Sequence, residues 1–212
     1  MIITHHGIEA FKVQFGDTVL AFNPVSKDSS YKKATRFGAD VALISTNHPD
    51  MNGADSVVFG EKIPVVVTGP GEYEVQGIVI KGFQTKSNYD KMERINTVYL
   101  VTLEGMNLLF LGALDQKELA SSILEEIDTV DIVFVPVGGE GVLDPNTAQK
   151  LAISLEPKII IPMHFEGVGQ KDALKTFLKE GGHSGAESVD KLTIKQKDLI
   201  GKEGEAVVIK PQ

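Results

Sequence analysis

The chain has 212 residues, 42% of them hydrophobic, which is enough to bury the core of one large domain. Its formal net charge is −8 and no cluster of Lys and Arg is present, which argues against nucleic acid as a partner. It contains no cysteine, which excludes disulfides and leaves histidine, carboxylate, carbonyl or water as the only ligands for a metal.

The sequence also argues against a membrane partner. No apolar run approaches the roughly 20 residues that a membrane helix requires. The first residues, "MIITHHGIEAF", lack the basic segment and long apolar run of a secretion signal. We therefore expect a cytoplasmic location, which the absence of cysteine also fits.

The first half of the sequence is rich in strand patterns. Alternation of apolar and polar residues around a turn predicts a hairpin, and a continuous apolar run predicts a strand buried on both faces. These patterns cover residues 11–24 with a turn at Gly16-Asp17, 40–46, 62–83 with turns at 69–71 and Gly77, and 96–112 with a turn at Glu104-Gly105. Residues 29–39 are polar and fit either a short helix or a loop.

In the second half, helix and strand patterns alternate. In one of the helices Asp144 is a plausible N-cap and Pro145 fits the first turn. The predicted helices are 116–127, 144–157 and 171–182, and the predicted strands are 130–139, 158–165 and several within 191–211. Meanders followed by this alternation predict a single α/β domain over residues 1–212, a four-layer αββα sandwich with two central sheets and helices outside.

Two histidines stand where chemistry is expected. His48 and His164 each follow a buried-strand pattern directly, and Asp50 is two residues beyond His48. Side chains at strand ends lie over the rim of a sheet, where functional sites gather. A structural reading is also open: Asp50 can accept backbone N–H bonds within a loop or pair with a neutral His48, and His164 can be a hydrogen-bonded, half-buried side chain.

Segments along almost the whole chain resemble the metallo-β-lactamase superfamily, in the metal-dependent hydrolase branch that includes L-ascorbate-6-phosphate lactonase-like proteins. In chain order they are "ITHHGIEAFKV" with "VLAFNP", "STNHPDMN", "GPGEYEVQGI" with "NTVYLV", "LLFLGALD", "DIVFVPVGG" and "EPKIIIPMHF". The resemblance implies the αββα sandwich and a two-metal hydrolase site. The glycines of "PVGGEG" are then interpreted as a tight turn under that site, because the loop lacks the Lys and Ser/Thr of a nucleotide-binding loop.

Carried over residue by residue, the resemblance makes His48, Asp50 and His164 metal ligands. The other ligand positions are replaced: Thr46 and Met51 stand for two histidines of the "H-x-H-x-D-H" motif, Ala113 for the bridging Asp, Ile8 for a histidine and Asn23 for an Asp. A further histidine of the family is expected near "GFQTKSNYDKMER", which contains none. A dinuclear zinc site is therefore not expected, because zinc in a catalytic site normally has three protein ligands and a water.

Two functions remain open at this point. The first is a degenerate family member kept for binding or assembly, without hydrolysis and with no metal, whose former active-site cleft holds a small molecule or nothing. The second is a hydrolase of a phosphoester, lactone or amide with one weakly held Zn, Mn or Fe ion, in which Asp50 is catalytic and His48 and His164 are ligands. His6, on the same strand face as Ile8, could compensate for a lost ligand. The sequence leaves open whether the chain forms a homo-oligomer.

Overall fold

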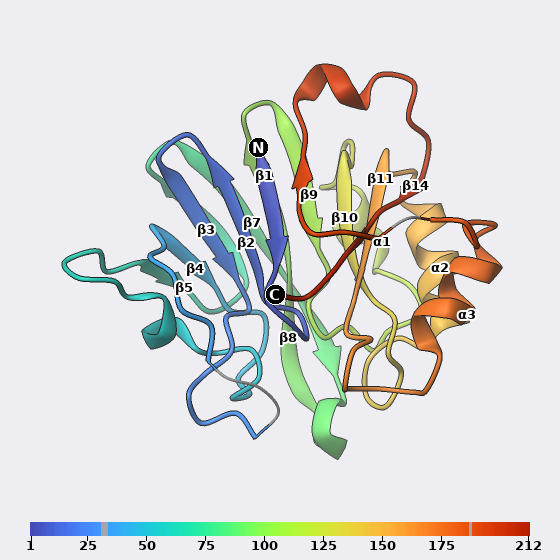
Figure 1. Cartoon of the computed structure of the whole chain (residues 1–212), viewed down its shortest axis with the longest axis horizontal. Coiled ribbons are helices and arrows are strands. Elements are labelled where there is room, and N and C mark those ends of the chain that lie inside the picture. The colour runs from blue at the N-terminus through green and yellow to red at the C-terminus, as the bar shows by residue number, and fades with distance from the viewer. Residues whose placement is uncertain (31–33, 187) are drawn as a thin grey trace.

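Two β-sheets pack face to face at the centre of the molecule (Figure 1). The computed structural model describes residues 1–30, 34–186 and 188–212. The first sheet has six strands in the order β13-β1-β2-β3-β4-β5. Their bounds are β1 Ile2–His5, β2 Phe11–Phe15, β3 Thr18–Phe22, β4 Val41–Leu43, β5 Val65–Val67 and β13 Leu192–Thr193.

The second sheet has seven strands in the order β14-β11-β10-β9-β8-β7-β6. Strands β6 to β9 form antiparallel hairpins, whereas β9, β10, β11 and β14 run parallel. Their bounds are β6 Gly71–Val75, β7 Ile78–Ser87, β8 Arg94–Leu103, β9 Met106–Phe110, β10 Ile132–Pro136, β11 Ile159–Met163 and β14 Glu205–Ala206. A small separate sheet pairs β12 Ser188–Val189 with β15 Val208–Ile209.

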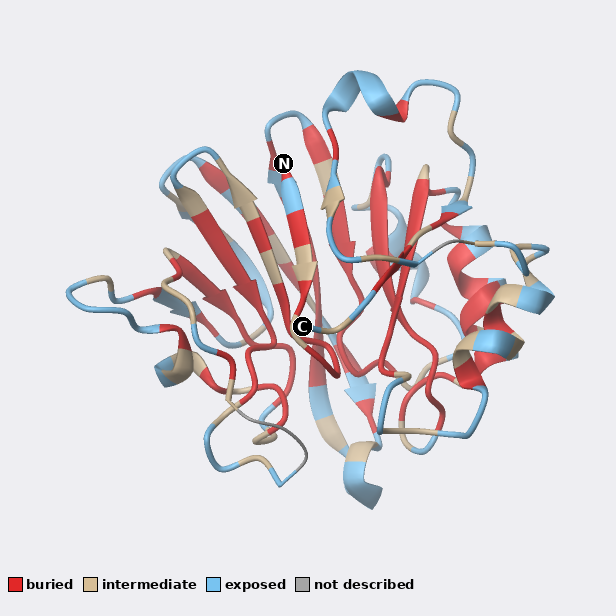
Figure 2. Ribbon diagram, in the orientation of Figure 1, coloured by how far each residue is buried: buried red, intermediate tan, exposed pale blue. Residues whose placement is uncertain are grey.

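The main core lies between the two large sheets, and both contribute aromatic rings to it. Phe22 of β3 lies 4.9 Å from Phe110 of β9 and 5.9 Å from Phe134 of β10, measured between ring centroids. Phe11 of β2 meets Phe134 edge-on at 5.0 Å. Figure 2 shows buried residues along the strands of both sheets. Burial of these large apolar side chains is the main force that holds the two sheets together.

The outer faces of the two sheets are covered differently. The helices α1 Ser121–Leu124, α2 Pro145–Ser154 and α3 Ala173–Glu180 accompany the seven-stranded sheet, and the second core cluster combines residues of its strands with Ile123, Leu151 and Phe177. The six-stranded sheet is covered by loops and by the 3₁₀ turn η1 Ala54–Val57, through a smaller cluster that includes Val57. The α/β fold class is confirmed, with this outer layer built largely of loops in the described residues.

Most predicted elements are found close to their predicted positions. The hairpins around Gly16-Asp17 and Glu104-Gly105 form as β2–β3 and β8–β9. Asp144 caps α2 by accepting hydrogen bonds from the backbone N–H groups of Asn146 and Thr147. Of the segment predicted as a helix or a loop, residues 31–33 lie outside the described residues and the rest contains no helix.

One predicted helix is much shorter than expected. Residues 116–127 have helical spacing, but α1 covers only Ser121–Leu124. The Gln116 side chain accepts a hydrogen bond from the backbone N–H of Lys86 at 2.8 Å, and the Asp115 N–H donates to the Lys86 carbonyl at 3.1 Å. These bonds tie the start of the segment to β7 and hold it out of a helix.

Candidate functional site

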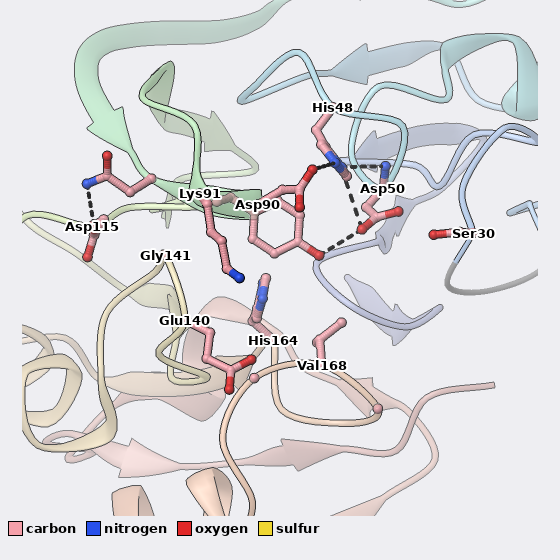
Figure 3. Close-up of a pocket in the computed structure, with 14 residues that line it drawn as sticks. Ser30, His48, Asp50, Asp90, Lys91, Asp115, Glu140, Gly141, His164 and Val168 are labelled. Carbon is pink, nitrogen blue, oxygen red and sulfur yellow. Dashed lines mark hydrogen bonds and ion pairs between the residues drawn. The ribbon is translucent and has the colours of Figure 1, made fainter.

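A pocket of about 1000 Å³ opens where several strands of both sheets end. Its lining includes His48 after β4, residues 88–91 after β7, residues 140–141 after β10 and His164 directly after β11 (Figure 3). The carboxyl ends of strands are the usual place for ligand sites in open α/β sheets. The three predicted site residues, His48, Asp50 and His164, all line this pocket.

Asp50 is buried, with 5% of its surface exposed, and both of its carboxylate oxygens already accept hydrogen bonds. Oδ1 accepts from the Ser29 hydroxyl at 2.5 Å and Oδ2 from the Tyr89 hydroxyl at 2.7 Å. The partners are therefore two hydroxyl groups, and not the backbone N–H groups that the structural reading of the sequence proposed. A carboxylate engaged in this way is less available to a metal ion.

His48 is oriented by its own loop. Its Nδ1 accepts a hydrogen bond from the Asp50 backbone N–H at 3.2 Å and lies 3.5 Å from Asp50 Oδ2. Because Nδ1 accepts, the neutral imidazole carries its proton on Nε2. That nitrogen lies 3.7 Å from the carboxylate of Asp90, which is 68% exposed.

Tyr89 packs on both candidate histidines. Its ring centroid lies 4.9 Å from that of His48 and 5.1 Å from that of His164, each at an interplanar angle of 86°. Burial, followed by the hydrogen bond to Asp50, raises the pKa of the Tyr89 phenol far above its ordinary value. The phenol therefore stays protonated and donates to Asp50. Tyr89 lies within "GFQTKSNYDKMER", the segment in which the resemblance led us to look for a histidine, and sequence reasoning missed it.

His164 is paired with an acid that sequence reasoning also missed. Its Nδ1 lies 2.8 Å from Oε1 of Glu9, and the side chains of His164 and Glu9 are 1% and 0% exposed. Glu9 Oε2 accepts from the Asn23 amide at 2.8 Å, and this amide also donates to the Ser45 hydroxyl at 2.8 Å. Asn23 is thus part of a buried hydrogen-bond network that holds Glu9. Glu9 gave no signal in the sequence, because its hydrogen-bond partner His164 is more than 150 positions away along the chain.

The other imidazole nitrogen of His164 is different. Nε2 is buried and has no hydrogen-bond partner among the described residues. Buried polar atoms are almost always paired, so an orphan at the floor of a pocket marks a place where a ligand group or water can bind. The backbone of Gly138 lies close against His164. A Cβ on Gly138 would be 2.3 Å from the His164 carbonyl oxygen, so only glycine fits at this position. The glycine-rich loop therefore permits a close backbone approach, whereas the sequence pattern predicts a tight turn.

The backbone is strained at three places around this floor. Ile8, Asn23 and His164 have positive φ angles of 52°, 40° and 62°. Positive φ is uncommon for any residue other than glycine and an outlier for a β-branched one such as isoleucine. The His164 N–H donates to the Ile8 carbonyl at 2.8 Å, so two of these residues hold each other in place.

Three positions that the resemblance assigns to metal ligands are now part of one apolar cluster. Ile8, Met51 and Ala113 are buried together with Ala10, Val25 and Val142, and Tyr89 and Val168 pack against them. Thr46, a fourth such position, donates its hydroxyl to the Ile95 carbonyl at 2.8 Å. Apolar side chains have taken up the space beneath Tyr89.

The residues present do not fit a metal ion as they stand. Among the described residues, no group of three or more His, Cys, Asp or Glu side chains is placed to hold one. The Tyr89 ring packs against both histidines, and Asp50 is occupied by two hydroxyl donors. His6 does not compensate, since it packs against Phe37 and Thr4 and does not line the pocket.

Comparison with known proteins agrees with the fold. The family described as the beta-lactamase superfamily domain matches residues 2–164. The chain belongs to this superfamily. A Bacillus cereus (strain Q1) protein named UPF0173 metal-dependent hydrolase is 23% identical over 195 residues, which cover 78% of this chain and 86% of that protein. A Bacillus anthracis (strain A0248) protein of the same name is 22% identical over 197 residues with the same coverage.

Solved structures of similar proteins extend over the whole chain. A Thermotoga maritima protein, whose name places it among Zn-dependent hydrolases of the metallo-β-lactamase superfamily, aligns with a TM-score of 0.77 and 28% identity, covering 100% of this chain and 99% of that one. Igni18, a metallo hydrolase from Ignicoccus hospitalis, aligns at 0.63 and 18% identity over 99% and 95% of the two chains, which shows the fold alone. The resemblance read from the sequence motifs is thus confirmed for superfamily and fold.

Within the described part of the chain, no helix is both long enough and apolar enough to cross a bilayer.

Proposed function

We propose that this chain is a member of the metallo-β-lactamase superfamily that binds a small molecule in the former active-site pocket and does not carry out metal-dependent hydrolysis. The observation that carries the proposal is the position of Tyr89. It contacts both histidines, donates to Asp50 and rests on the apolar cluster of Ile8, Met51 and Ala113. Together these side chains replace a charged metal site by a satisfied hydrogen bond and a packed apolar floor.

Physical chemistry favours this arrangement without a metal. Two cations about 4 Å apart need bridging negative charge, and the position of the bridging carboxylate is Ala113. Binding a cation at His48, Asp50 and His164 would require Tyr89 to leave Asp50 and expose the apolar residues below it. The pocket itself remains open and polar at its rim, with room for a small molecule.

The experiment is a measurement of metal content on protein purified without a tag or chelator. We expect well under one equivalent of zinc, manganese or iron per chain, and a melting temperature that a chelator leaves unchanged, since only a ligand of the native state stabilises it by mass action. Near one equivalent of metal that disappears in a His48→Ala/His164→Ala variant would overturn the proposal. A metal-binding relative taken through the same purification is the positive control.

The second candidate is a hydrolase with one metal ion, and the observation in its favour is the unpaired Nε2 of His164. Here Asp50 would be catalytic and His48, Asp50 and His164 would hold the ion. A panel of phosphodiester and lactone substrates, assayed with added zinc, manganese or iron, separates the two. Turnover abolished by Asp50→Asn would support the hydrolase, and absence of turnover on every substrate would support the binding protein.

Several coarser properties go with the proposal. The relatives' names describe metal-dependent hydrolases, so this chain would be a non-catalytic branch of such proteins. The acidic net charge supports the absence of a nucleic-acid partner. A cytoplasmic location remains a prediction, and the oligomeric state remains open.

A further inference from the structure

The pocket floor and its rim differ in what they offer a ligand. At the floor, Glu9 as a carboxylate can only accept, so His164 Nδ1 carries the proton and donates it. In the neutral imidazole the remaining nitrogen, Nε2, is then a hydrogen-bond acceptor. It is buried and unpaired among the described residues, and His164 is one of the residues that line the pocket. A ligand that reaches the floor must therefore offer an N–H or O–H group.

The charges of the pocket lining are mostly negative. The carboxylates of Asp90, Asp115 and Glu140 lie at the rim and that of Asp50 at the floor, against one ammonium, that of Lys91. The buried carboxylate of Glu9 adds to the same field from below. A cleft lined by one sign of charge concentrates ligands of the opposite sign. Anionic ligands such as phosphoesters are disfavoured by this field.

Lys91 shows how an ammonium group fits. Its side chain extends into the pocket toward His164, between the rim residues Asp90 and Glu140 (Figure 3). Among the described residues it forms no ion pair within 4.0 Å. The Tyr89 ring and the Val168 side chain give the same pocket an apolar surface against which a methylene chain can lie.

We propose that this pocket binds a small cationic amine, whose ammonium group donates to Nε2 of His164 while the rim carboxylates supply the charge. The inference rests on the proposed binding function and names its ligand class. Lys91 occupies part of the same space and competes with the ligand. The ligand is thus opposite in charge to a phosphorylated substrate.

The experiment compares three probes that share one methylene chain, putrescine, butanediol and adipate, by calorimetric titration and thermal shift. We expect putrescine to bind and to raise the melting temperature, butanediol to bind at least about tenfold more weakly, since hydrogen bonds to charged groups are stronger, and adipate not to bind. Equal or tighter binding of adipate would overturn the amine assignment while keeping a small-molecule pocket. No binding of putrescine at millimolar concentration would overturn the inference and leave the proposed function to the metal measurement.

Variants of exposed residues keep the test independent of folding. Glu140→Gln should weaken putrescine roughly two- to fivefold, the range of an exposed charge pair, and Lys91→Ala should strengthen it. Glu61→Gln, a matched change of an exposed residue outside the pocket, should have no effect. His164→Ala should weaken binding by at least about tenfold, provided that circular dichroism shows a folded protein. Unchanged affinity in both Glu140→Gln and Lys91→Ala would contradict the proposal.

Discussion

The two sides of the pocket floor are built in opposite ways. On one side His164 is fully buried, and a chain of hydrogen bonds from Glu9 through Asn23 to Ser45 supports its Nδ1. Its Nε2 has no partner within the described parts of the chain. On the other side Asp50 and His48 lie on a loop, and Tyr89, Ser29 and the loop backbone satisfy their polar atoms. The first side is held ready for a ligand, and the second is closed on itself.

This difference divides the positions that the resemblance assigns to metal ligands into two groups. Under Tyr89, the described residues Ile8, Met51 and Ala113 form a buried apolar cluster without a charged side chain among them. Around His164, by contrast, Glu9 and Asn23 form a buried hydrogen-bond network, and His164 and Asn23 have positive φ angles, a strain that costs on the order of 1–3 kcal/mol per residue. Such a cost is compatible with a functional role for His164. A substitution on this side of the pocket floor should therefore reduce the free energy of unfolding more than one on the other side.

The largest effect is expected on the His164 side. Glu9→Ala leaves the Nδ1–H of His164 and one of the N–H groups of the Asn23 amide without their acceptor. We expect a loss of about 2–6 kcal/mol in the free energy of unfolding, measured by urea titration, since each buried donor left unsatisfied costs about 1–3 kcal/mol. Glu9→Gln is the matched control, since it keeps the shape and part of the hydrogen bonding and should lose less. Stability within 1 kcal/mol of wild type in Glu9→Ala would show that the network does not hold the fold.

The next effect concerns the Tyr89 hydroxyl. Tyr89→Phe removes the donor to Asp50 Oδ2 and leaves that oxygen buried, which should cost about 1–3 kcal/mol at neutral pH. Because burial and Asp50 raise the Tyr89 pKa, the folded state binds the phenolic proton more tightly than the unfolded state does. This contribution is present in full below about pH 10, the ordinary value of tyrosine, and is lost as the pH rises beyond it.

Unfolding experiments at neutral and alkaline pH check this sign. The stability difference between wild type and Tyr89→Phe should shrink as the pH rises. Tyr99, whose pKa burial also raises, is present in both proteins and cancels in the comparison. A difference that grows with pH would mean that Tyr89 ionises more easily in the folded protein than in the unfolded one.

The sequence predicted elements well wherever local pattern decides them. The β2–β3 and β8–β9 hairpins follow from alternation and turn residues, and Asp144 followed by Pro145 predicted the start of α2. The prediction of a helix over residues 116–127 was wrong, because the Gln116 side chain is hydrogen-bonded to the backbone of β7. Helical spacing in the sequence cannot reveal such a contact.

The candidate site was only half visible in the sequence. Motif position placed His48, Asp50 and His164 on one pocket, because strand ends meet at one edge of the sheets. It did not reveal Glu9, whose partner is distant in the chain, or Tyr89, which lies in a segment where the resemblance implies a histidine. Replacements at Ile8, Met51 and Ala113 were visible as lost ligands, but their gathering into one apolar cluster needed the fold.

A smaller effect tests how the rim on the His164 side is anchored. The glycine-rich loop that carries Glu140 ends at Asp144, which caps α2. Asp144→Ala should cost about 1 kcal/mol at neutral pH, measured by chemical unfolding. Burial raises the pKa of Asp144, but hydrogen bonds from the Thr147 hydroxyl and nearby backbone N–H groups outweigh it and hold the pKa below its ordinary value.

The sign of the pH dependence follows from that lowered pKa. The cap contributes in full above about pH 4, the ordinary value of the carboxyl, and is lost as the pH falls through the lower value of the folded state. The difference between wild type and Asp144→Ala should therefore be constant near neutrality and shrink in acid. Asp144→Asn, which can still accept a hydrogen bond, should lose less than the alanine variant at neutral pH.

The smallest effect is expected for His48→Ala, on the closed side of the floor. The His48 side chain is 14% exposed, its Nδ1 accepts one backbone N–H, and its Nε2 lies 3.7 Å from the carboxylate of Asp90, which is exposed to solvent. We expect a loss of about 1 kcal/mol or less on urea unfolding, because the substitution removes one hydrogen bond and one solvent-exposed polar contact. The same change at His164 should cost several times as much, since it empties a buried site and leaves Glu9 unpaired. Equal losses at His48 and His164 would mean that the two sides carry similar structural weight, and the contrast between a prepared side and a closed side would fail.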